Sequence, residues 1–155
     1  MNVSGFWKTW MILWCWGVLL FGVVLALVGV PATDGPGQAV FRIISGNPES
    51  HALLSQPGMR FGIGIQGALT IGWAITMMGM IRAAETDGAP VWRYLTGGLI
   101  AWYLIDSGIS VMTGLGLNAV SNTLLVILFL IPVLRSGVLS KSQIMIRLDG
   151  NRLNG

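Results

Sequence analysis

Apolar residues gather in four long segments of the chain, at about 6–30, 59–81, 91–115 and 118–134. Each has roughly the length of a transmembrane helix, which needs about 20 mostly apolar residues. Polar and turn-forming residues separate the segments, and the longest such stretch is 31–58. The pattern predicts an all-α integral membrane protein, an antiparallel four-helix bundle formed by a single domain over residues 1–155.

The first segment also has features of a signal peptide, namely Lys8, the apolar stretch and Val30-Pro31-Ala32. Its apolar run is longer than that of a usual signal peptide, so we interpret it as a retained helix. In the second segment, Gly64, Ala68 and Gly72 repeat at every fourth position. Small residues at this spacing allow helices to approach closely.

The connection at 31–58 is rich in Pro, Gly and Ser, but it also contains a short apolar pattern at 38–44. This pattern predicts a helix, and Gly46 is placed to end it, because glycine adopts the left-handed conformation common after a helix. Loops of this length are often lids or binding loops. We expect this one to lie on the membrane surface over the helix ends.

Composition agrees with a lipid environment, since hydrophobic residues make up 54% of the chain and charged residues only 10%. A typical soluble domain has about 25% charged residues. The net charge of +3 does not indicate nucleic-acid binding, because the basic residues lie singly between apolar segments.

Those basic residues instead predict an orientation. With a cytoplasmic N-terminus, seven of the nine fall on the cytoplasmic side, which fits the positive-inside rule. The seven are Lys8, Arg82, Arg93, Arg135, Lys141, Arg147 and Arg152, and the other two are Arg42 and Arg60. We therefore expect both termini and the tail at 136–155 in the cytoplasm, the long loop outside, and a bacterial inner-membrane location.

Asp106 is the one acidic residue that falls well inside an apolar segment. A carboxylate is costly there, so it marks a candidate functional site. On a helix, Ser110 shares its face, and Asn118 and Asn122 follow across a short hairpin. Gln66 and Arg60 approach from the second segment. We expect the candidate ligand-binding residues to form a polar track towards the outer surface: Asp106, Ser110, Asn118, Asn122, Gln66 and Arg60.

Three interpretations of this track stay open. Asp106 can be a neutral, hydrogen-bonded structural residue, since polar side chains often join membrane helices. It can bind a ligand or handle a proton, which also makes it the candidate catalytic residue. It can also face another subunit. A direct Arg60–Asp106 bridge is less favoured than a network through Gln66, Ser110 or water.

The sequence contains none of the common motifs for metal, haem or nucleotide binding. One histidine and one cysteine, Cys15, exclude paired-histidine haem ligation and make a zinc site or a Cys–His pair nearly excluded. We predict no metal site. A bound lipid or quinone fits the apolar composition.

The four segments, the long loop after the first, Arg60-Phe61-Gly62 at the start of the second and the aspartate in the third resemble the DoxX-like group of small membrane proteins. The resemblance covers the topology of residues 6–135. It implies a four-helix bundle in a bacterial inner membrane, and some members are linked to quinone-coupled sulfur oxidation. The single Cys15 gives that chemistry no support here.

The sequence favours a non-enzymatic accessory subunit or scaffold of a membrane complex, with lipids and other membrane subunits as partners. One alternative is a lipid- or quinone-binding protein with a polar pocket around Asp106. Another is a membrane isomerase or oxidoreductase that uses Asp106 as acid or base.

Overall fold

The computed structural model describes residues 5–47 and 50–139, so all but the first four residues of the predicted tail lie outside the described part. The long helices are α1 (Gly5–Leu27), α3 (Pro57–Asp87), α4 (Ala89–Met112) and α5 (Gly116–Ser136). Between α1 and α3 lie the 3₁₀ helix η1 (Pro31–Thr33), α2 (Gly35–Ser45) and the 3₁₀ helix η2 (Ser50–Ser55). The four long helices are each long and apolar enough to cross a membrane, as in a small multi-pass membrane protein.

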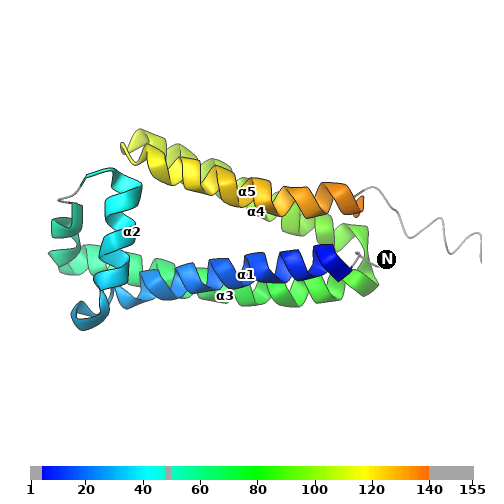
Figure 1. The fold of residues 1–155 in the computed structure, drawn as a ribbon, viewed down its shortest axis with the longest axis horizontal. Coiled ribbons are helices and arrows are strands. Elements are labelled where there is room, and N and C mark those ends of the chain that lie inside the picture. The colour runs from blue at the N-terminus through cyan, green and yellow to red at the C-terminus, as the bar shows by residue number, and fades with distance from the viewer. Residues whose placement is uncertain (1–4, 48–49, 140–155) are drawn as a thin grey trace, which may run out of the picture.

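The helices lie in two layers that diverge towards one end (Figure 1). One layer contains α1 and α3, which pack along each other, and the other contains α4 and α5. At the wide end α2 runs across the gap between the layers and also packs against α5 (Figure 1). At the opposite end α3 passes into α4 through Gly88 alone, whose φ of 73° suits glycine.

Glycine explains why α1 and α3 pack so closely. A Cβ added at Gly67 would lie 2.2 Å from the backbone nitrogen of Ala26, and one at Gly22 would lie 3.0 Å from the Gly67 carbonyl oxygen. Gly64 similarly faces Gly29. The close contact that the sequence predicted exists, but its residues differ: Gly72 has no neighbour within 4 Å of its would-be Cβ.

Two tryptophans of α1 fasten this layer to α5. Trp10 Nε1 donates to the Leu128 carbonyl oxygen at 2.9 Å, and Trp14 Nε1 donates to that of Leu125 at 3.0 Å. Pro132 has no N–H to donate to Leu128, so that carbonyl is free to accept from Trp10.

The buried core occupies the narrow end of the bundle. It is formed by the first halves of α1 and α4 and the second halves of α3 and α5, and its most enclosed side chains include Met11, Cys15, Leu99 and Phe129. Beyond this core the two layers diverge (Figure 1), and the space between them at the wide end holds a cavity.

Candidate functional site

A cavity of about 820 Å³ fills the wide end of the bundle, and all five α-helices line it. Most of its lining is apolar. The polar lining side chains are Gln66, Thr70, Asp106, Asn118, Ser121 and Asn122. Binding sites for small molecules in proteins typically enclose about 300–1,000 Å³ with mostly apolar walls and a few polar groups, so this cavity has the size and character of such a site.

Three tryptophans from different helices line the cavity and adjoin the core. The ring centroids of Trp14 and Trp73 lie 6.2 Å apart, and those of Trp73 and Trp102 lie 5.6 Å apart. Trp14 also packs edge-on against Phe129 of the core. The aromatic rings therefore form the floor of the cavity.

The helix α2 closes the opposite end of the cavity. Val40, Phe41, Ile43 and Ile44 all line it. The apolar side of this short helix thus covers the site, while Gly46 ends the helix in a left-handed conformation with φ of 65°. The predicted helix at 38–44 and its glycine stop are confirmed.

The cavity is only partly enclosed. Phe21 of α1 and Leu124 of α5 both line it, and they are 38% and 58% exposed. Accessible apolar side chains from both layers therefore line the cavity wall.

Asp106 lies at the polar wall, where α4 meets α5. Its Oδ1 accepts hydrogen bonds from Asn122 Nδ2 at 2.7 Å, from Asn118 Nδ2 at 2.9 Å and, more weakly, from Ser110 Oγ at 3.3 Å. Asn118 Nδ2 also donates to Ser110 Oγ at 2.8 Å. We call Asp106, Ser110, Asn118 and Asn122 the Asp106 cluster.

The local sequence explains how the cluster forms. Asp106 and Ser110, and likewise Asn118 and Asn122, are four residues apart, so each pair shares a helix face. The turn between α4 and α5 is short and contains Gly114 at φ of 81°. Asp106 lies about 9 Å of helical rise from the end of α4, so the cluster is within the half of the span nearest α2.

Arg60 does not join this cluster. Its Nη2 lies 2.7 Å from Asp34 Oδ2, and its Nη1 donates to the Val28 carbonyl oxygen at 3.0 Å. Asp34 is 7% exposed and also accepts from Gln38 Nε2 at 2.8 Å. The direct Arg60–Asp106 bridge that the sequence disfavoured is absent, and the favoured network through Gln66 or Ser110 is wrong for Arg60 within the described residues, because Arg60 forms an ion pair with Asp34, the residue that precedes α2.

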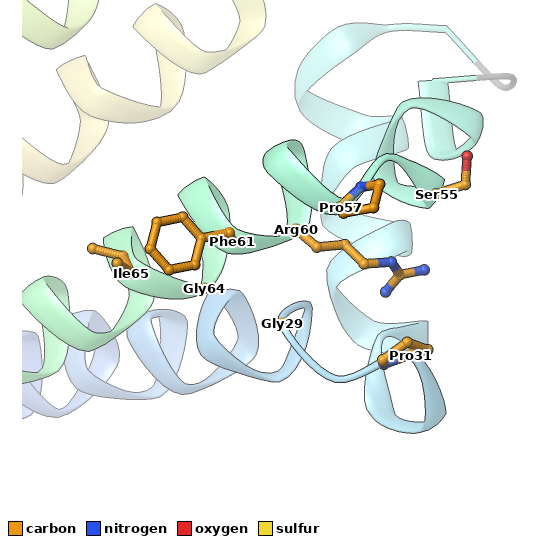
Figure 2. Close-up of a pocket in the computed structure, with 8 residues that line it drawn as sticks. All are labelled: Gly29, Pro31, Ser55, Pro57, Arg60, Phe61, Gly64 and Ile65. Atoms are coloured by element: carbon orange, nitrogen blue, oxygen red, sulfur yellow. The ribbon is translucent and has the colours of Figure 1, made fainter.

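Arg60 instead lines a separate, smaller pocket of about 490 Å³. Figure 2 shows its side chain reaching from α3 towards Pro31, with Phe61 and Ile65 along α3 on the other side. Two of the guanidinium nitrogens are already engaged, by Asp34 and by the Val28 carbonyl oxygen beyond the end of α1. This arrangement ties the start of α2 to α1 and α3.

The structure thus brings together five of the six predicted site residues. Four of them line the cavity, namely Asp106, Asn118, Asn122 and Gln66. Ser110 is hydrogen-bonded to Asp106 and Asn118. Sequence reasoning missed Asp34 as the partner of Arg60. The available signal was charge, since 31–58 holds only two acidic residues, Asp34 and Glu49.

In comparisons with family models, curated proteins and solved structures, nothing matches this chain. None of these comparisons bears on the resemblance to the DoxX-like group, which stays a prediction.

Proposed function

We propose that this protein binds an apolar small molecule with a polar head, such as a lipid or quinone, in the cavity beneath α2. The observation that carries the proposal is the cavity of about 820 Å³, whose walls are apolar except near the Asp106 cluster and Gln66. Such a division suits an amphipathic ligand, with its tail among apolar side chains and its head at the polar wall.

The accessory-subunit role favoured by the sequence stays a prediction, as does the enzymatic role of Asp106. A cavity with mostly apolar walls and a few polar groups supports ligand binding more directly than it supports an accessory or an enzymatic role. Membrane lipids are the partners that this function requires.

We also propose that the α2 end of the molecule faces the outside of a bacterial inner membrane and that both termini are cytoplasmic. The distribution of the basic residues supports this orientation. A tag on either terminus that is protease-sensitive in inverted vesicles but protected in intact spheroplasts would agree with it, and the opposite pattern would contradict it.

The binding proposal is tested by filling the cavity. Gly62 lines the cavity, and a Cβ there would meet nothing within 4 Å, so Gly62→Phe adds a ring without a backbone clash. Gly72→Phe is the matched control on the same helix, because Gly72 also has open space but lies outside the cavity.

The measurement is native mass spectrometry of the three proteins released from lipid nanodiscs. We expect the wild type and Gly72→Phe to retain a small molecule and Gly62→Phe to lose it. The proposal fails if the wild type retains nothing, or if Gly62→Phe retains the molecule as well as the control does.

A further inference from the structure

The Asp106 cluster uses its own side-chain donors internally and leaves three acceptor oxygens unpaired. The side-chain amides of Asn118 and Asn122 donate to Asp106 Oδ1, and the Ser110 hydroxyl donates to the Asp106 carbonyl oxygen at 2.8 Å. Within the described residues, Asp106 Oδ2 and the amide oxygens of both asparagines accept no side-chain hydrogen bond.

These three oxygens are also accessible. Among the buried side-chain nitrogens and oxygens of the described part, only Thr96 Oγ1 has no hydrogen-bond partner. The unpaired oxygens of Asp106, Asn118 and Asn122 are therefore not sealed in the protein, and their residues line the cavity. A ligand head that binds there must offer hydrogen-bond donors or positive charge.

Charge makes the requirement more specific. Among the residues that the structure describes, Asp106 is the only charged one that lines the cavity, and its hydrogen-bond partners are neutral. Arg60 follows the cavity-lining Met59 in the sequence, but its guanidinium is paired with Asp34. A carboxylate in apolar surroundings is stabilised by a bound cation, which removes the cost of an unpaired charge.

The aromatic floor favours the same kind of head. Trp102 precedes Asp106 by one helical turn and lines the cavity with it, and Trp73 packs against Trp102. A cation over the face of a tryptophan is attracted by the ring electrons, and this attraction is strongest where water is excluded.

We propose that the ligand is a cationic amphiphile, with an ammonium head at Asp106 and an apolar tail between the layers. This inference rests on the proposed function and narrows its ligand class. An anionic head would meet three acceptor oxygens and a negative charge. An alcohol or quinol could donate a hydrogen bond to these oxygens, but it would leave the charge of Asp106 unbalanced.

Three probes with the same tail separate charge from hydrogen bonding. Dodecyltrimethylammonium carries charge without a donor, dodecylammonium carries both, and 1-dodecanol carries a donor without charge. Binding is measured by tryptophan fluorescence in nanodiscs of phosphatidylcholine, since three tryptophans line the cavity. Gly62→Phe and Gly72→Phe show how much of each signal comes from the cavity.

We expect both ammonium probes to bind the wild type at least tenfold more tightly than dodecanol does. Asp106→Asn keeps the side-chain shape and should reduce ammonium affinity at least tenfold while leaving dodecanol affinity within twofold. The reaction of buried Cys15 with a thiol dye on heating verifies that the variant is folded, because Cys15 is fully buried.

The proposal is overturned if dodecanol binds the wild type as tightly as the ammonium probes, or if Asp106→Asn keeps the ammonium affinity. In either case, binding that Gly62→Phe abolishes would leave the proposed function standing. If no probe binds saturably to the wild type, both proposals fail for this ligand class.

Discussion

Two aspartates at the wide end of the bundle have opposite electrostatic environments. Asp34 is held by the guanidinium of Arg60 at 2.7 Å and by the amide of Gln38. Asp106 is held by two asparagine amides and a serine hydroxyl, all of them neutral. The first aspartate belongs to an ion pair that fastens α2, whereas the second lines the cavity and has no cationic partner among the described residues.

The partners of each aspartate indicate whether it has a structural or a binding role. A nearly buried carboxylate with a cation at contact distance has its charge balanced, so it offers little to a ligand. A carboxylate held only by neutral donors is oriented and partly stabilised, but its charge still favours a cation. Replacing each aspartate by asparagine, which has nearly the same shape, tests both roles.

The largest expected effect is at Asp34. Asp34→Asn preserves the shape of the side chain but leaves Arg60 with no counterion, and breaking a buried ion pair in this way is strongly destabilising. Breaking a fully buried pair costs about 3–5 kcal/mol. Because the Arg60 side chain is 18% exposed, we expect a smaller loss of about 2 to 3 kcal/mol in the free energy of unfolding.

Unfolding can be followed by the reaction of Cys15 with a thiol dye in a denaturant titration, because Cys15 is fully buried in the folded state. The double variant Asp34→Asn, Arg60→Gln should recover part of the loss, since it removes both charges. Equal stability of Asp34→Asn and the wild type would show that the ion pair does not fasten α2.

An intermediate effect is expected at Asn122, which is 5% exposed and makes the shortest hydrogen bond to Asp106. Hydrogen bonds to charged groups contribute about 1.5–3 kcal/mol, so Asn122→Ala should cost about 2 kcal/mol. In an Asp106→Asn background the same change should cost about 1 kcal/mol or less, because the acceptor is then neutral.

Gln38→Ala is the matched comparison at the other aspartate, where Arg60 still balances the charge after the amide is removed. We expect it to cost less than Asn122→Ala does in the same denaturant titration. The reverse order would mean that Asp106 is neutral and that the two aspartates do not differ as described.

The sequence predicted the parts of this comparison that depend on local spacing. The four apolar segments are present as helices, with α3 continuing past its apolar segment through Arg82 to Asp87, and the helix before Gly46 follows from its pattern. Asp106 could be joined to Ser110, Asn118 and Asn122 because helical spacing and one short turn relate all four residues.

The parts that depend on how distant segments pack could not be predicted. The local sequence does not indicate that Arg60 pairs with Asp34 rather than with Asp106, because the pairing depends on where α2 crosses the bundle. Tryptophans in a membrane helix commonly lie at the membrane surface. Trp14 is instead 7% exposed and donates to α5, because the Leu125 carbonyl lies within its reach.

The smallest effect on stability is expected from Asp106→Asn, the change that should most affect binding. The two amide hydrogen bonds to Oδ1 survive, because an asparagine oxygen accepts in the same place, and no cation in the described residues loses a partner. Removing an unbalanced charge from an apolar cavity even favours folding, so we expect a change within about 1 kcal/mol. Both variants are measured in the same denaturant titration. If Asp106→Asn lowers the free energy of unfolding as much as Asp34→Asn does, the charge of Asp106 is balanced inside the folded chain. If Asp106→Asn is stable but no longer prefers the ammonium probes, the role of this aspartate is to bind the ligand.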